Sequence, residues 1–82
     1  LYQHPKYFLS LYLQKDLIAK VREIIQTLPE KFQVPLILFY LSDCSIEQIA
    51  AIIKKPPGTI KSRLFKGRSL IKKRLEEDGY ER

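Results

Sequence analysis

Residues 45–64 decide the fold of this chain, and they read SIEQIAAIIKKPPGTIKSRL. Ser45 stands three residues before Gln48, the spacing of a capping box, which predicts that a helix starts there. This short helix should end at Lys54-Lys55-Pro56, and Pro57 suits the first position of a second helix that continues to about Glu77. A connection of about three residues between two helices has the length found in a helix-turn-helix.

Upstream of this stretch, apolar residues recur with helical spacing. The stripe of a first amphipathic helix is formed by Leu17, Val21, Ile24, Ile25 and Leu28. Pro29 ends that helix and suits the first turn of the next, which should run from about Pro29 to Leu41. Its inward-facing residues are expected to be Phe32, Leu36, Phe39 and Tyr40. Residues 36–41 alone would also fit a strand, but the sequence offers no second strand to pair with it.

Together these segments predict an all-α fold, a small bundle of four helices ending in a helix-turn-helix. Pro35 lies inside the second helix, where it removes one backbone hydrogen bond, so we expect a kink there. The domain should span residues 15–78, followed by a tail at 79–82 after Gly79 breaks the last helix. The apolar segment 1–14 is either a fifth helix or a backward extension of the first from Ser10, and it should cover the bundle or a partner.

Length and composition exclude several classes of protein. A chain of 82 residues makes one small domain, and its start at Leu1 suggests a fragment of a longer protein. No apolar run approaches the ~20 residues that cross a bilayer, so we expect no membrane insertion. Cys44, the one cysteine, cannot form an intramolecular disulfide, which favours the cytoplasm. We expect no metal site, no cofactor, no small-molecule substrate and no catalytic residues, because nucleophile–base pairs and paired carboxylates are missing.

The positive charge is concentrated in one segment. Residues 54–74 hold nine Lys and Arg and no Asp or Glu, although the whole chain carries a net charge of only +6. A solvated helix face usually mixes both signs, so this asymmetry favours binding to a polyanion over mere exposure.

A helical wheel of the last helix separates two faces. Ile60, Leu64, Gly67, Ile71 and Leu75 fall within an ~80° arc and form the core stripe. Gly67 costs about 1 kcal/mol of helix propensity relative to Ala, which a close backbone approach to the helix of residues 45–54 would explain. The opposite arc holds Lys61, Ser62, Phe65, Lys66, Ser69, Lys72 and Lys73.

This opposite face has the side chains that a groove-reading helix needs. Its lysines suit phosphates, Ser62 is short enough to approach a base edge, and Phe65 can contact a thymine methyl group. The alternative for Phe65 is that it folds back onto the edge of the core or onto an N-terminal tyrosine. At the start of the helix, free backbone amides would point at a phosphate, Gly58 permits close approach, and Thr59 adds a hydroxyl.

At this point the chain resembles a known family. The order and spacing of four segments across about residues 16–76 are similar to region 4 of bacterial sigma factors, most of all the extracytoplasmic-function group. These segments are Leu28-Pro29-Glu30-Lys31-Phe32, the apolar run 36–41, Ser45-Ile46-Glu47-Gln48-Ile49-Ala50 and Gly58-Thr59-Ile60-Lys61-Ser62-Arg63-Leu64. Lys54 departs from the family, which often has Gly in the turn, and Pro56 replaces the usual capping Ser or Thr. Segment 1–14 matches nothing typical of it.

The resemblance implies a function and partners. Such a domain recognises the minus-35 element of promoter DNA, docks on the flap of the RNA polymerase β subunit, and in many members is sequestered by an anti-sigma factor. By position, the groove contacts would come from Lys61, Ser62, Phe65 and Lys66. Gly58, Thr59, Arg63 and Arg68 would support these contacts or touch phosphate.

Two other functions stay open from the sequence. One is the output domain of a response regulator, which also uses a four-helix arrangement, although the Leu28-Pro29 junction favours the sigma-factor interpretation. The other is a protein-interaction module that holds polymerase or an anti-sigma factor without reading DNA.

Overall fold

The computed structural model describes residues 15–79, with side chains from residue 18 onward, and this part of the chain is built from helices without a strand. The elements are α2 (Lys15–Thr27), α3 (Glu30–Leu36), the π-helix η1 (Ile37–Leu41), α4 (Ile46–Ile53) and α5 (Pro57–Glu77). The predicted all-α class is therefore confirmed, and the strand alternative for residues 36–41 is wrong. The expectations for segment 1–14 lie outside the described residues.

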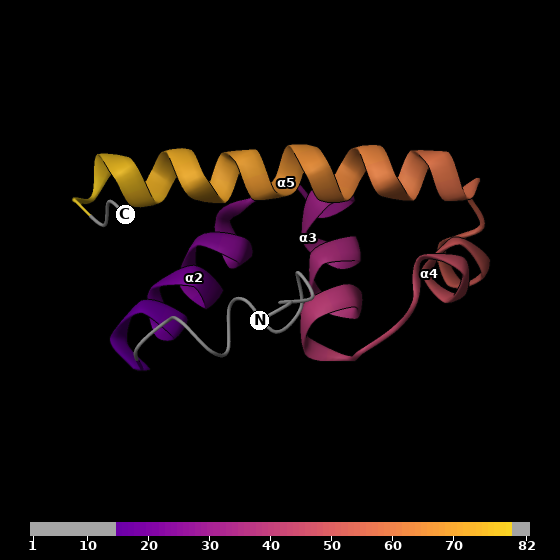
Figure 1. Ribbon diagram of the computed structural model, residues 1–82, viewed down its shortest axis with the longest axis horizontal. Helices are drawn as coiled ribbons and strands as arrows, with labels where there is room; N and C mark the ends of the chain where they lie inside the picture. Colours follow the sequence, from indigo (N-terminus) through magenta and orange to yellow (C-terminus); the bar gives the residue numbers. More distant parts are fainter. Residues whose placement is uncertain (1–14, 80–82) are drawn as a thin grey trace, which may run out of the picture.

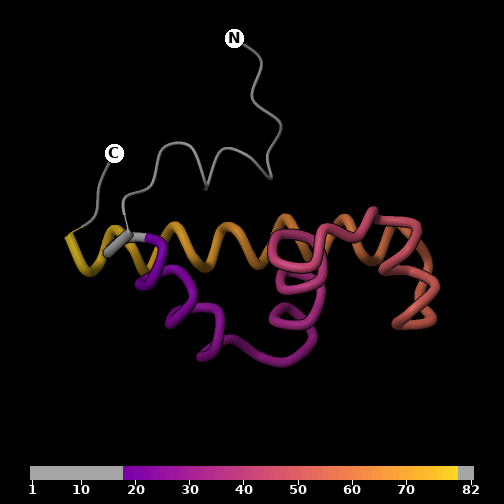
Figure 2. Tube along the Cα trace, turned by 90° about the horizontal axis from the view of Figure 1, so that it is seen from below, coloured from indigo at the N-terminus to yellow at the C-terminus, as the bar shows by residue number. Residues whose placement is uncertain are grey.

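The longest helix, α5, forms one side of the molecule. The shorter helices α2, α3 and α4 all lie against the same side of it, with α4 near the start of α5 and α2 near its end (Figures 1 and 2). The opposite side of α5 is consequently left without a covering element in the described part of the chain. No helix in this part has the length and apolar character required to span a membrane.

The core lies where the helices meet beneath α5. Its most deeply buried aliphatic side chains come from four different elements and are at most 1% exposed: Ile24, Leu36, Ile49 and Ile60. Burying one such side chain contributes roughly 1.5–3 kcal/mol, more than an exposed polar pair supplies. Residues of the predicted α5 stripe are buried at Ile60, Leu64, Gly67 and Ile71 and partly buried at Leu75.

The same inward pattern holds in the first two predicted helices. Val21, Ile24 and Ile25 are buried and Leu28 is half-buried, whereas the side chain of Leu17 lies outside the described residues. Leu36 and Phe39 are buried, and Phe32 and Tyr40 are half-buried. The two stripes are thus confirmed where the structure describes them.

The segment predicted as one helix from Pro29 to Leu41 differs from an α-helix at both ends. Pro29 is the extended N-cap residue (ψ 145°) and not the first helical residue, and its carbonyl oxygen accepts from the Phe32 and Gln33 amides. The helix passes through Pro35 and then widens to π geometry, so that the Ser42 amide donates to the Ile37 oxygen five residues back. The kink expected at Pro35 stays a prediction.

Gly67 lets α5 approach α3, which corrects the expectation that the helix of residues 45–54 comes close there. A Cβ atom on Gly67 would lie 2.8 Å from Leu36 Cδ1 and 3.2 Å from Leu36 Cγ. The neighbour is therefore a side chain of α3, and not the backbone of α4. The expectation was wrong because a wheel shows which side of a helix is buried without showing which element covers it.

The helix-turn-helix consists of α4, residues 54–56 and α5. The predicted capping box is confirmed: Ser45 Oγ accepts from the Gln48 amide at 3.0 Å, and Gln48 Oε1 accepts from the Ser45 amide at 2.8 Å. Lys54 then ends α4 in the left-handed conformation, with φ 66° and ψ 47°. Pro57 occupies the first turn of α5, as expected, and Asp78 and Gly79 follow its end.

Candidate nucleic-acid interface

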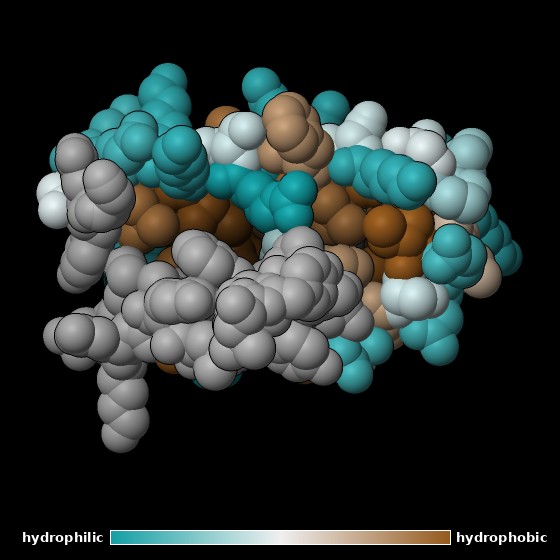
Figure 3. All heavy atoms as spheres, viewed as in Figure 1, coloured by the Kyte–Doolittle hydropathy of each residue, from teal (hydrophilic) through white to brown (hydrophobic). Residues whose placement is uncertain are grey.

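The side of α5 that faces away from the other helices carries most of the predicted site residues. Arg68 is exposed at the flank of this side, beside Tyr40 of η1. Exposed side chains along the side itself are Lys61, Ser62, Phe65, Lys66, Ser69, Lys72 and Lys73. We call this set the outer face of α5. Viewed from the side, the edge of the molecule along α5 is largely hydrophilic (Figure 3). Of the remaining predicted residues, Gly58 is exposed, and Thr59 and Arg63 are half-buried.

Phe65 is an apolar side chain placed in solvent among polar neighbours. It is 67% exposed, the most exposed of the large hydrophobic residues in the described part of the chain. The alternative that it folds back onto the edge of the core is therefore wrong, and a contact with an N-terminal tyrosine lies outside the described residues. The ring of Phe65, exposed beside Lys61, Ser62 and Lys66, can therefore contact a ligand without being removed from the hydrophobic core.

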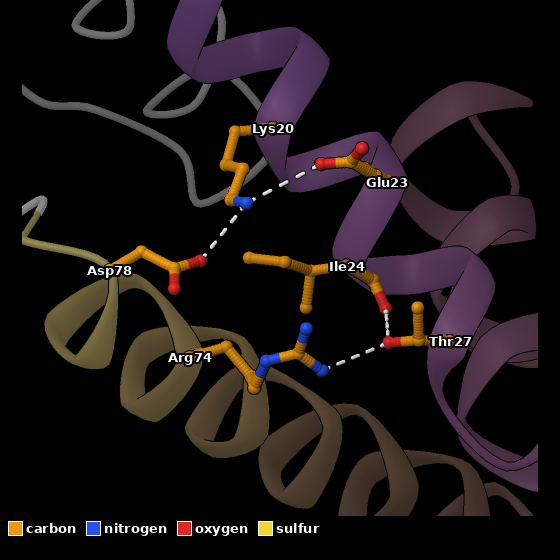
Figure 4. Close-up of polar contacts among 6 residues, drawn as sticks. All are labelled: Lys20, Glu23, Ile24, Thr27, Arg74 and Asp78. Carbon is orange, nitrogen blue, oxygen red and sulfur yellow. Dashed lines mark hydrogen bonds and ion pairs between the residues drawn. The ribbon is translucent and has the colours of Figure 1, made fainter.

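The electrostatic character of this face follows from the positions of the acidic residues. The ion pairs between described residues join Lys20 to Glu23, at 3.4 Å, and to Asp78, at 3.0 Å (Figure 4). These pairs lie at α2 and beyond the end of α5, and no lysine of the outer face forms an ion pair with a described residue. The hydrogen bond that Lys20 donates to Asp78 is the main cause that raises the pKa of Lys20 above its ordinary 10.5.

The start of α5 adds to the positive field. Its N-cap residue is Pro56, which provides no side-chain cap, and the first turn holds no acidic residue. The positive end of the helix dipole is thus not compensated locally. A Cβ atom on Gly58 would meet nothing within 4 Å, so the backbone there is open to a close approach. The exposed Lys54 and Lys55 precede this helix start.

Two arginines of the basic segment bind hydroxyl groups of other helices. Arg74 Nη1 donates to Thr27 Oγ1 at 3.1 Å, and Thr27 Oγ1 donates to the Ile24 carbonyl oxygen at 2.7 Å (Figure 4). This chain of bonds ties the end of α5 to α2. Arg68 Nη1 donates to the hydroxyl of Tyr40 at 3.2 Å, which ties the middle of α5 to η1.

Tyr40 is a residue of this region that sequence reasoning assigned to the core. Its ring is half-buried and packs edge-on against Phe39, with 5.0 Å between ring centroids, but its hydroxyl lies at the surface beside Arg68. No local signal could have found this contact, because the two residues stand 28 positions apart in the sequence. The exposed Lys54 and Lys55 were not among the predicted site residues. Their place in the basic segment 54–74 is a sequence signal that could have included them.

The described residues form no group of His, Cys, Asp and Glu that could hold a metal ion. Cys44 is a half-buried free thiol that donates to the Ser42 carbonyl oxygen at 3.9 Å. The outer face of α5 offers positive charge, hydroxyl groups and one aromatic ring.

Comparison with known proteins places this domain in a family. Residues 18–71 match the family described as sigma-70, region 4. The RNA polymerase sigma-H factor of Pseudomonas aeruginosa is 38% identical over 64 residues, which cover 78% of this chain and 33% of that protein. The ECF RNA polymerase sigma-E factor of Escherichia coli K12 is 36% identical over 67 residues, which cover 82% of this chain and 35% of that protein.

A third relative extends the similarity to another group of bacteria. The ECF RNA polymerase sigma factor SigW of Bacillus subtilis is 31% identical over 62 residues, which cover 76% of this chain and 33% of that protein. The chain thus spans about a third of the length of these relatives. No solved structure matches it. Since the family match covers more than half of the chain and agrees with a helical bundle ending in a helix-turn-helix, the chain belongs to the sigma-70 region 4 family, in the extracytoplasmic-function (ECF) group of sigma factors.

Proposed function

We propose that this domain binds the minus-35 element of promoter duplex DNA through the outer face of α5, as the C-terminal domain of a sigma factor that directs RNA polymerase to start transcription. The observation that carries the proposal is the outer face itself, which is basic, uncovered by the other described helices and centred on a ring that is 67% exposed. The family assignment supports a promoter-binding role over that of a response-regulator output domain.

The dimensions and chemistry of the face fit the major groove. An α-helix fits this groove, which is about 12 Å wide and presents a distinct pattern of donors and acceptors for each base pair. Lys66, Lys72 and Lys73 reach phosphates on its walls, which positions the helix without reading sequence. Ser62 and Phe65 are the residues assigned to base readout, Ser62 by a hydrogen bond and Phe65 by contact with a thymine methyl group.

The start of α5 supplies a second kind of phosphate contact. Pro57 has no amide proton and the Thr59 amide donates to the Pro56 carbonyl oxygen at 3.0 Å, so the Gly58 amide is the one that the first turn leaves for a phosphate. The open backbone at Gly58 allows a phosphate to come close. Thr59 and Arg63 flank this point. Anchoring the start of the helix on the DNA backbone would fix how deeply Ser62 enters the groove.

Promoter recognition also requires the polymerase. Relatives of this domain are named RNA polymerase sigma factors, and the chain spans about a third of them. We therefore assign catalysis to the polymerase, with this domain acting in the cytoplasm by docking on the β flap and being open to an anti-sigma factor. A pull-down with the isolated β flap tests this partner. Failure to bind, even with the rest of the sigma factor restored, would contradict the docking role.

DNA binding is tested by fluorescence anisotropy with a promoter duplex and a scrambled duplex over a range of salt concentrations. Four or five phosphate contacts predict a slope of about −4 in log K against log salt. Lys72→Ala should weaken binding to both duplexes equally, whereas Ser62→Ala or Phe65→Ala should reduce discrimination between them by about 1–2 kcal/mol. Arg22→Ala, which removes an exposed cation of α2, is the control and should change neither. Equal losses on both duplexes for Ser62→Ala and Phe65→Ala would contradict base readout.

A further inference from the structure

Two arginine–hydroxyl pairs join α5 to the rest of the bundle. They differ in whether the hydroxyl group also donates a hydrogen bond within the protein. In the first pair, the Thr27 hydroxyl accepts a hydrogen bond from Arg74 and donates one to the Ile24 carbonyl oxygen at 2.7 Å. This pair is closed, because its hydroxyl both accepts and donates within the protein. Arg74 is half-buried, as expected for a link between packed helices.

The second pair, Tyr40 and Arg68, is open. The Tyr40 hydroxyl accepts from Arg68 at 3.2 Å, and within the described part of the chain its own proton has no acceptor. The bond lies at the surface, and Arg68 uses one of the five N–H donors of its guanidinium there. A solvent-exposed bond of this kind contributes little to the stability of the fold, in contrast to the Tyr40 ring packed on Phe39.

The position of this pair places it beside the proposed DNA contacts. On the helical wheel Arg68 lies on the same flank of α5 as Lys61, seven residues earlier, and Lys72, four residues later. Tyr40 lies within η1 and brings its hydroxyl to this flank from there. The flank thus gains donors from a second element.

We propose that Tyr40 and Arg68 together bind one backbone phosphate of the DNA, with the Tyr40 hydroxyl holding the guanidinium in place and donating its own proton to the phosphate. This inference rests on the DNA-binding function proposed above and adds to it a contact from outside the helix-turn-helix. Phosphate contacts by Tyr hydroxyls and Arg side chains position a protein on DNA without reading its sequence.

The test is a set of binding measurements on the full chain with the promoter and scrambled duplexes. Tyr40→Phe keeps the ring and removes only the hydroxyl, so it should weaken binding to both duplexes about 3- to 10-fold, the effect of one hydrogen bond, and leave the salt slope unchanged. Arg68→Ala removes a charge and should also make the slope shallower by about 0.9. In the Arg68→Ala background, Tyr40→Phe should have less than about a 2-fold effect, because the pair acts as a unit.

The closed pair provides the matched control. Thr27→Val removes a hydroxyl that likewise accepts from an arginine of α5, and it should leave DNA affinity unchanged while thermal unfolding reports any loss of stability. Tyr40→Phe with unchanged affinity, next to a weakening by Lys72→Ala, would overturn the Tyr40–Arg68 site and leave the proposed function intact. Equal losses of affinity and melting temperature in Tyr40→Phe and Thr27→Val would also overturn it. An intact chain that binds neither duplex would overturn both proposals.

Discussion

Lys54 holds a backbone conformation that is costly for any residue with a β-carbon. Its φ of 66° and ψ of 47° lie close to the ideal left-handed helix, and Lys has no side-chain group that stabilises it there. This conformation costs about 1–2 kcal/mol, and Gly relieves it. Gly also gains freedom in the unfolded chain, which offsets about 0.4–1 kcal/mol of the benefit. We therefore expect Lys54→Gly to stabilise the domain by about 0.5–1 kcal/mol.

Thermal unfolding followed by circular dichroism measures this effect. In a domain of this size, the expected gain raises the melting temperature by about 2–8 °C. Lys54→Ala removes the same charge but keeps the β-carbon, so it should give no such gain. Lys55→Gly should destabilise, because Lys55 does not have a positive φ. A melting temperature for Lys54→Gly that equals or falls below that of Lys54→Ala would refute the attribution to backbone strain.

Three further perturbations test the packing, the capping and the ion pair of the bundle. Gly67→Ala places a Cβ atom 2.8 Å from the fully buried Leu36, and the overpacking should cost ~2–3 kcal/mol. This cost exceeds the ~1 kcal/mol gain in helix propensity, so urea unfolding should show that the free energy of unfolding falls by about 1–2 kcal/mol. Ser45→Ala removes half of the capping box and should lower stability by about 1 kcal/mol in the same assay; a loss below ~0.3 kcal/mol would contradict the cap's role. The raised pKa of Lys20 means that its pairing with Asp78 stabilises the fold fully below pH 10.5, and that this stability is lost as the pH rises through the folded-state value. The urea midpoint of Lys20→Met should accordingly fall less between neutral and strongly alkaline pH than that of the native chain, and an identical fall would contradict this linkage.

The arginines of the basic segment show how tertiary contacts divide residues that look alike in sequence. Arg68 and Arg74 stand six positions apart in the same helix and both carry a full charge. Arg74 is committed to Thr27 in a closed chain of hydrogen bonds, whereas Arg68 shares an exposed hydroxyl and keeps donors for a ligand. A count of positive charges therefore overstates the number available to DNA.

Much of the candidate interface follows from local rules. A helical period of 100° per residue separates the buried stripe of α5 from its outer face, so the exposure of Ser62, Phe65 and Lys66 was predictable. The capping box at Ser45 marks a helix start because its side chains bond backbone amides that have no partner within the helix. Pro57 marks one because it has no amide proton that would need such a partner. These are interactions between residues within one turn of each other.

The sequence by itself determined the helical class, the helix-turn-helix and the side of α5 that faces solvent, because each depends on spacing within a few residues. Only the tertiary structure decided that Leu36 fills the space above Gly67 and that Tyr40 reaches Arg68. The π geometry after Pro35 and the left-handed conformation of Lys54 were likewise seen only in the structure. Contacts between residues about 30 positions apart depend on how helices are placed against one another, and helical periodicity carries no information about that placement.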